Sequence, residues 1–138
     1  MRSKKIPADR AEAPPTQSPE EPAWLAAVRA AESKKATDIR VLDLREVTSF
    51  ADYFVICTAG NSRQIQAVAD EIGLKLKQRG ELPSSLEGYA NAEWILADYG
   101  DYLVHVFSER ARAFYDLERL WRQAREMPIP ASTPPVSM

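Results

Sequence analysis

The sequence has few of the residues that build redox, nucleophilic and metal sites. Its 138 residues include one cysteine, Cys57, and one histidine, His105. A single cysteine excludes an intrachain disulfide and a cysteine-based metal site, and it fits a reducing compartment. A catalytic thiol would need a histidine partner. We predict that Cys57 is a small core residue and His105 a hydrogen-bonded structural residue, with general-base catalysis by His105 as the alternative.

The chain also lacks a long apolar run and a strong charge of either sign. No run approaches the ~20 residues of a membrane-spanning helix. Residues 1–9 are basic but have no apolar signal-peptide core, and acids follow quickly, which is unusual in a transit peptide. The formal net charge of −2 argues against a dedicated nucleic-acid binder and permits docking on a basic protein. These absences predict a cytoplasmic protein with no membrane contact.

Glycine-rich phosphate loops are missing, since the five glycines form neither a P-loop nor a GxGxxG pattern. The turn at 59–62 could hold an anion at a helix N-terminus, although a loop capped by Asn61 or Ser62 is the preferred interpretation. We therefore predict no cofactor. Asp43, Asp52, Asp98 and Asp101 could form a metal-binding set, but they stand singly at strand ends. We interpret them as turn and edge residues and predict no metal site and no catalytic residue.

The chain is predicted to contain one domain between two tails. Residues 1–17 are polar and proline-bearing, and 127–138 are proline-rich, so both are expected to be disordered. Residues 18–126 form the predicted domain. Helix periodicity, strand-like apolar runs and turn residues predict its elements. They are a helix that starts at Ser18-Pro19-Glu20-Glu21 and ends near 34–35, a strand at 38–44, a strand at 53–58, a helix at 62–78, a short edge strand at 85–87, a hairpin of 94–99 and 102–107, and a last helix capped by Ser108.

The last helix is predicted to bury one apolar stripe and to expose its arginines, Arg112 among them. Two hairpin-like pairs of strands with helices between them indicate an α/β fold. We expect a two-layer domain in which helices pack on a mixed β-sheet of four to five strands. The predicted stripe consists of Ala113, Phe114, Leu117, Leu120, Trp121 and Ala124.

The hairpin carries the strongest indication of a binding site. Gly100-Asp101 provides its turn. Trp94, Leu96 and Asp98 are predicted to project to one side, and Ile95 and Tyr99 to the other. An aromatic anchor beside carboxylates is typical of a surface that grips a basic protein. The alternative, that Trp94 is a plain core residue, is equally compatible with the periodicity.

Six blocks of sequence resemble the RsfS/Iojap family of ribosomal silencing factors. They occur in order at compatible spacing, and the resemblance covers about residues 22–124. The proline-bearing N-terminal extension departs from the family pattern. The blocks are DYFVIC (52–57), GNSRQ (60–64), EG (87–88), WILADYGD (94–101), VHVF (104–107) and RAFYDLERLW (112–121).

The resemblance implies a fold similar to nucleotidyltransferases without their catalytic acids, and a protein that is not an enzyme. It implies binding to the large ribosomal subunit through ribosomal protein L-fourteen, which blocks joining of the small subunit and represses translation in nutrient limitation. A role in large-subunit maturation is also implied. Little direct RNA contact is expected, because an acidic domain is repelled by bare RNA. The implied contact residues are Trp94 and Asp98, with Ile95, Tyr99 and Asp101 as weaker candidates.

Two alternatives remain open at this stage. A nucleotide-binding or nucleotidyl-transfer enzyme of similar fold would be stabilised by nucleotide with Mg²⁺. A homodimer of the free protein could use the same hairpin aromatics as a self-interface.

Overall fold

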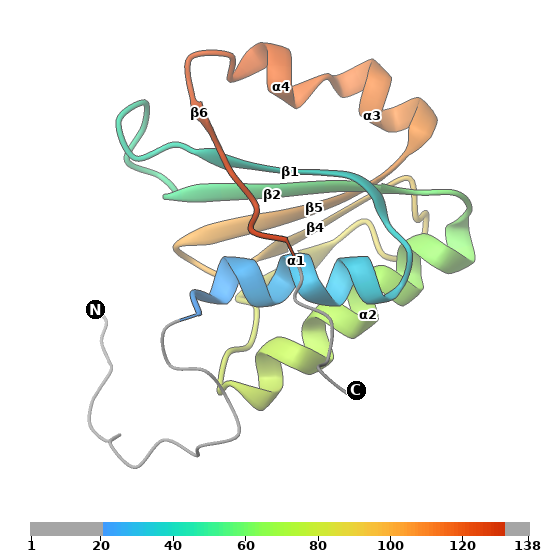
Figure 1. The fold of residues 1–138 in the computed structure, drawn as a ribbon. Helices are drawn as coiled ribbons and strands as arrows, with labels where there is room; N and C mark the ends of the chain where they lie inside the picture. The colour runs from blue at the N-terminus through green and yellow to red at the C-terminus, as the bar shows by residue number, and fades with distance from the viewer. Residues whose placement is uncertain (1–20, 132–138) are drawn as a thin grey trace.

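A six-stranded mixed sheet forms the centre of the protein (Figure 1). The structure, a computed structural model, describes residues 21–131. The strand order is β3-β4-β5-β2-β1-β6, and only the central pair β2 and β5 is parallel among these neighbours. The predicted α/β fold class and the edge strand at 85–87 are confirmed. The strands are β1 (Thr37–Asp43), β2 (Tyr53–Ala59), β3 (Ser85–Glu87), β4 (Trp94–Asp98), β5 (Tyr102–Ser108) and β6 (Arg125–Met127).

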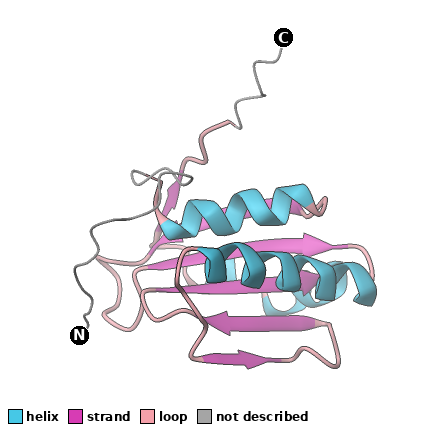
Figure 2. Ribbon diagram, turned by 90° about the horizontal axis from the view of Figure 1, so that it is seen from below, coloured by secondary structure: helices cyan, strands magenta, loops and turns pink. Residues whose placement is uncertain are grey.

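Two long helices cover one face of the sheet. α1 (Ala23–Ser33) and α2 (Ser62–Gln78) run side by side below it in Figure 1, and Figure 2 shows both from that side. Their apolar stripes meet alternate residues of the strands, because successive strand side chains point to opposite faces. Cys57 lies in this core with no exposed surface, as predicted, and burial raises the pKa of its thiol to about 12.

The helix ends show which capping predictions hold. Asn61 caps α2 by accepting a hydrogen bond from the Gln64 backbone N–H at 2.9 Å. The Gln64 amide in turn donates to the carbonyls of Lys34 and Lys35 just beyond α1, so one side chain ties the two helices together. α1 begins at Ala23 rather than in the predicted capping box, since Pro22 is still extended. Ser18 lies outside the described residues.

The prediction of one long last helix is wrong. The chain forms two short helices on the opposite face of the sheet, α3 (Glu109–Tyr115) and α4 (Leu117–Leu120) (Figure 1). Asp116 separates them with a left-handed backbone (φ 49°) that ends α3 and redirects the chain. Leu117 consequently faces the sheet, while Phe114 and Leu120 from the predicted stripe are 77% and 71% exposed.

Arg112 was expected on the wet side of that helix but is buried. Its guanidinium donates to Glu118 (Nε to Oε2, 2.9 Å) and to the Thr58 hydroxyl (2.7 Å), and it lies 3.5 Å from the Asp38 carboxylate. A buried charge is tolerated when its donors are paired in this way. Arg112 therefore fastens α3 and α4 to the sheet.

β6 is the strand that the sequence did not reveal. Its Met127 pairs with Val41 of β1, so the sheet continues past the predicted domain boundary at residue 126. Ile129 also packs against the core on the α1–α2 face. Most of the predicted C-terminal tail and all of the N-terminal tail lie outside the described residues.

Candidate partner-binding surface

Trp94, the first residue of β4, is half-buried on the sheet face that carries α3 and α4. Its ring stacks on Phe107 with centroids 5.0 Å apart and contacts Tyr115 of α3 at 4.5 Å. Its indole N–H donates to Nδ1 of His105 at 3.1 Å. Trp94 is thus neither a plain core residue nor a free surface residue, because packing holds its ring with part of it exposed.

His105 supports Trp94 from beneath. The residue is buried, and burial lowers the pKa of its imidazole to about 3. The ring is therefore neutral, with Nδ1 as the acceptor for Trp94. The Phe54 ring packs against it in an edge-to-face arrangement, with ring centroids 4.5 Å apart. The predicted hydrogen-bonded histidine is confirmed, and no nucleophile is among the partners that these contacts give it.

Gly88 fixes where β4 begins. Its φ is +83°, and a Cβ at this position would lie 2.0 Å from the Trp94 carbonyl oxygen. Only glycine permits both the left-handed backbone and such a close approach. Gly88 belongs to the EG block (87–88), which carried no predicted role. The structure shows that it positions the strand that carries Trp94.

The five predicted contact residues do not share one face. Trp94 and Asp98 project to the α3–α4 side, together with Leu96, while Ile95 is fully buried beneath α1 and α2. Ile95 therefore cannot touch a partner directly, and we remove it from the site. Tyr99 is on the far side, where it stacks on Tyr102 with centroids 5.2 Å apart. Asp101 is exposed in the turn.

Asp98 also has a structural task. Its Oδ1 accepts a hydrogen bond from the Gly100 N–H at 2.8 Å, and Gly100 takes the positive φ (93°) that the turn requires. The carbonyl of Asp98 accepts from the Ser84 N–H at 2.7 Å. Asp98 is only partly exposed, so one carboxylate oxygen holds the turn while the charge remains near the surface.

Two further residues complete this surface. Leu96 is half-buried between Trp94 and Asp98, and Glu87 of the edge strand β3 pairs with it across the ladder. Residues directly opposite in an antiparallel pair point to the same side of the sheet. The predicted alternation along the strand had already placed Leu96 on this side, without naming it as a contact residue, whereas Glu87 needed the β3–β4 register. We call Glu87, Trp94, Leu96 and Asp98 the β4 surface.

The β4 surface belongs to a strongly acidic part of the chain. Residues 81–109 contain six acidic residues and no lysine or arginine, although the chain as a whole is nearly neutral. Tyr102 shields one of these charges by donating its hydroxyl proton to Glu81 at 2.7 Å. The remaining carboxylates lie along the β3–β4 edge, its turn and the start of α3. Positively charged partners would be attracted to this edge.

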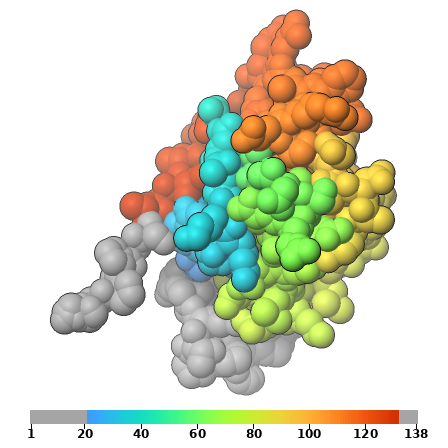
Figure 3. Space-filling model, turned by 90° about the vertical axis from the view of Figure 1, so that its right-hand side faces the viewer, coloured from blue at the N-terminus to red at the C-terminus, as the bar shows by residue number. Residues whose placement is uncertain are grey.

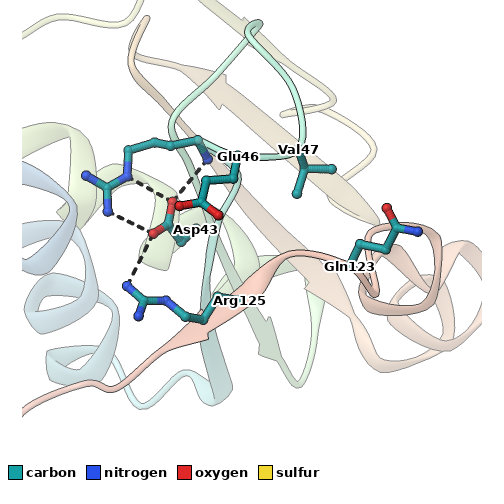
Figure 4. Close-up of a pocket in the computed structure, with 6 residues that line it drawn as sticks. Asp43, Glu46, Val47, Gln123 and Arg125 are labelled. Carbon is teal, nitrogen blue, oxygen red and sulfur yellow. Dashed lines mark hydrogen bonds and ion pairs between the residues drawn. The ribbon is translucent and has the colours of Figure 1, made fainter.

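A polar pocket at the opposite edge has a structural explanation (Figure 4). Asp43 at its centre accepts two hydrogen bonds from the Arg45 guanidinium, at 2.9 and 2.8 Å, and lies 3.5 Å from Arg125 of β6. The Arg45 guanidinium holds the pKa of the Asp43 carboxyl at about 2. The ion pair between Asp43 and Arg125 thus connects β1 to β6.

Asp43, Asp52, Asp98 and Asp101 lie at one end of the sheet but do not converge. Asp43 faces arginines, Asp98 caps its turn, and Asp52 reaches the Asp101 carbonyl only through its backbone N–H at 2.6 Å. Among residues 21–131, no cluster of three His, Cys, Asp or Glu side chains is arranged to hold a metal ion. The same residues contain no helix with the length and apolarity needed to span a bilayer.

Comparison with known proteins gives consistent matches across the chain. Residues 15–137 match the family described as "Ribosomal silencing factor during starvation". The ribosomal silencing factor RsfS of Bacillus subtilis is 41% identical over 98 residues, which cover 71% of this chain and 83% of the relative. The chloroplastic protein Iojap of Zea mays is 36% identical over 108 residues, 76% of this chain and 46% of that longer protein.

Solved structures agree with the sequence matches. A crystal structure from Bacillus halodurans has a TM-score of 0.67 at 37% identity, covering 75% of this chain and 93% of its own. A crystal structure from Chromobacterium violaceum has a TM-score of 0.71 at 33% identity, covering 80% and 91%. Sequence and fold therefore agree over most of the described residues, and the chain belongs to the RsfS family of ribosomal silencing factors.

Proposed function

We propose that this protein binds the large ribosomal subunit through ribosomal protein L-fourteen and thereby blocks joining of the small subunit. Translation is repressed by occupancy of a surface, in nutrient limitation, and no chemical step is needed. The family to which the chain belongs and the names of its relatives support a ribosomal role. Such a protein would act in the cytoplasm, where free subunits meet, and the same contact could assist maturation of the large subunit.

The observation that carries the proposal is the β4 surface. A partly exposed tryptophan, held rigidly by His105 and Phe107, provides an aromatic anchor. The anchor lies beside carboxylates, in a 29-residue stretch (81–109) without any lysine or arginine. A ribosomal protein rich in lysine and arginine is complementary to that charge, whereas a bare phosphate backbone is not. Asp101 in the turn and Tyr99 on the far face are peripheral to this contact.

The direct test is co-sedimentation of the purified full chain with large subunits, small subunits and joined ribosomes. We expect pelleting with large subunits and a loss of subunit joining as the chain is titrated. Asp98→Asn keeps an oxygen to accept from Gly100 and removes only the charge. It should weaken binding about five- to ten-fold at low salt and less at high salt.

Matched variants separate binding from folding. Trp94→Ala should reduce affinity by about 30-fold, equivalent to ~2 kcal/mol, if the ring is a hot spot. Trp94→Ala also leaves His105 without its hydrogen-bond donor. A loss of affinity in this variant is therefore assigned to the contact only if the variant retains its thermal unfolding transition. Glu46→Gln removes an exposed carboxylate beyond β1, near the opposite edge, and should leave binding unchanged. Equal losses for Asp98→Asn and Glu46→Gln would contradict the β4 surface, and pelleting with small subunits alone would contradict the function.

A further inference from the structure

The segment that follows the acidic stretch has the opposite charge. Residues 110–125, which include α3 and α4, contain five arginines and two acidic residues. Two of these arginines already have partners. Arg112 makes buried contacts with Glu118 and Thr58, and the Arg125 guanidinium lies 3.5 Å from the Asp43 carboxylate. Arg110, Arg119 and Arg122 remain. All three are exposed and make no ion pair or side-chain hydrogen bond within the described residues 21–131.

Large apolar side chains lie among these unpaired arginines. Phe114 follows Arg110 by one helical turn, so the two side chains are neighbours on α3. Tyr115 is half-exposed, and Leu120 stands next to Arg119 on α4. Ala111, Arg112 and Leu117 face the sheet, which leaves this set directed outward. We call Arg110, Phe114, Arg119, Leu120 and Arg122 the α3–α4 surface; the segment lies in orange at the top of Figure 3.

A pocket of about 400 Å³ opens where this surface meets β4. Its apolar lining residues are Ala111, Phe114 and Tyr115, and its charged lining residues are Arg110 and Glu93. One oxygen of Glu93 accepts from the Ser108 hydroxyl at 2.7 Å. The other carboxylate oxygen takes part in no hydrogen bond of the described residues. The pocket thus offers an aromatic wall, a cation and an acceptor within one small volume.

These features fit a nucleotide better than an acidic protein. Single-stranded nucleic acids are bound by aromatic side chains that stack on bases, and by arginines that pair with the phosphates between them. A carboxylate oxygen accepts from the exocyclic amino group of cytosine. An acidic peptide would use the arginines, but its carboxylate side chains would offer Glu93 no hydrogen-bond donor.

We propose that the α3–α4 surface binds single-stranded RNA, with one unstacked base in the pocket between Phe114 and Glu93. Arg110, Arg119 and Arg122 hold the phosphates. This inference goes beyond the docking on a ribosomal protein and does not depend on it. It departs from the expectation of little RNA contact, which rested on the net charge of −2. That value averages over an acidic edge and a basic helical surface.

The test is fluorescence anisotropy of the full chain with labelled oligocytidine and oligouridine of about 15 nucleotides, near the upper site size of single-strand binders. Oligocytidine should bind more tightly, because uridine has no exocyclic amino group for Glu93. Phe114→Ala should weaken binding about ten-fold with the salt dependence unchanged. Replacement of Arg110, Arg119 and Arg122 by glutamine should lower the slope of log affinity against log salt by about 2.

A charge-matched control decides whether the contact is specific. Lys34, Lys75 and Lys77 are exposed on the α1–α2 side, and their joint replacement by glutamine removes the same charge. Affinity should then fall no more than about two-fold. An equal loss in both triple variants would overturn the proposal in favour of diffuse attraction. Tight binding of polyglutamate in place of RNA would overturn the proposal in favour of an acidic protein partner. An RNA affinity unchanged by Phe114→Ala would contradict stacking of a base on Phe114. Binding of the chain to isolated L-fourteen tests the other proposal separately.

Discussion

Residues 81–109 and 110–125 adjoin in sequence and in space, yet they differ in charge, in architecture and in how they are held. The first stretch has six acidic residues and no basic side chain, and it forms the β3–β4–β5 side of the sheet. The second has five arginines and forms two short helices on the sheet face. They meet where Trp94 contacts Tyr115, with ring centroids 4.5 Å apart.

The comparison shows how a small domain can present two unlike surfaces side by side. The acidic edge is positioned by backbone ladders, so its side chains are free to vary in charge without loss of the strand pairing. The basic helices are too short to be stable alone and depend on the contacts of one buried arginine, Arg112. Mutation of a charged residue should therefore affect the free energy of unfolding differently on the two surfaces.

The largest effect is expected where the acidic edge is fixed to the sheet. Gly88→Ala places a Cβ against the Trp94 carbonyl at a residue with φ +83°. Strain and displacement of β4 should lower the free energy of unfolding by about 4 kcal/mol. Urea unfolding would measure it. Gly73→Ala is the matched control, because its Cβ meets no atom within 4 Å, and it should stabilise α2 by about 0.5–1 kcal/mol.

α3 and α4 should separate from the sheet when Arg112, which fastens them to it, loses its ion-pair partner Glu118. Glu118→Ala leaves the buried Arg112 guanidinium with only Thr58 and the exposed Asp38. An unpaired buried charge should cost about 3 kcal/mol of unfolding free energy. Glu46→Ala, at an exposed carboxylate, should change it by less than about 0.5 kcal/mol. Similar values for the two variants would show that α3 and α4 are held by apolar packing alone.

A third test uses His105, which lies beneath the contact between the two surfaces. Burial lowers the pKa of His105 from 6.5 to about 3, so the unfolded chain binds the proton first as the pH falls. Stability should be constant above the unfolded value and should fall below it, by about 2 kcal/mol between about pH 7.5 and about pH 5. Carboxylates stay largely ionised in that window.

The sequence has no other histidine, which makes the assignment direct. His105→Leu should abolish the pH dependence in this window, and urea unfolding at several pH values would measure it. A slope that persists in His105→Leu would mean that another group titrates in this window, and a chain with His105 that shows no slope would mean that burial does not lower the pKa of this histidine.

Sequence reasoning located the strands well because their signal is local. The continuous apolar run at 53–58 and the alternation along 94–98 each predict which side chains are buried. The same alternation placed Trp94 and Asp98 on one face of the hairpin. Asn61 was found as a cap for the same reason. The candidate site was therefore visible in outline, including its anchor and one of its carboxylates.

The errors occur where distant residues decide the local structure. The stripe from Ala113 to Ala124 is a good helical pattern, yet Asp116 has a left-handed backbone, and the side chains of Arg112 and Glu118 pair across this break. β6 has no strand signature of its own and exists because β1 offers it an edge and Asp43 attracts Arg125. Ile95 was assigned to the surface by resemblance, although its alternation with Trp94 points it into the core.

The smallest effects on folding should come from the exposed charges that distinguish the two surfaces. Glu87→Gln on β3 and Arg119→Gln on α4 each remove one solvated charge that has no ion-pair partner within residues 21–131. The free energy of unfolding should change by less than about 0.5 kcal/mol in each. Their binding effects should be opposite: Glu87→Gln should weaken docking on a basic protein and spare RNA, and Arg119→Gln should do the reverse. Loss of both activities in either variant would mean that the two surfaces act as one site, since neither charge is needed for the fold.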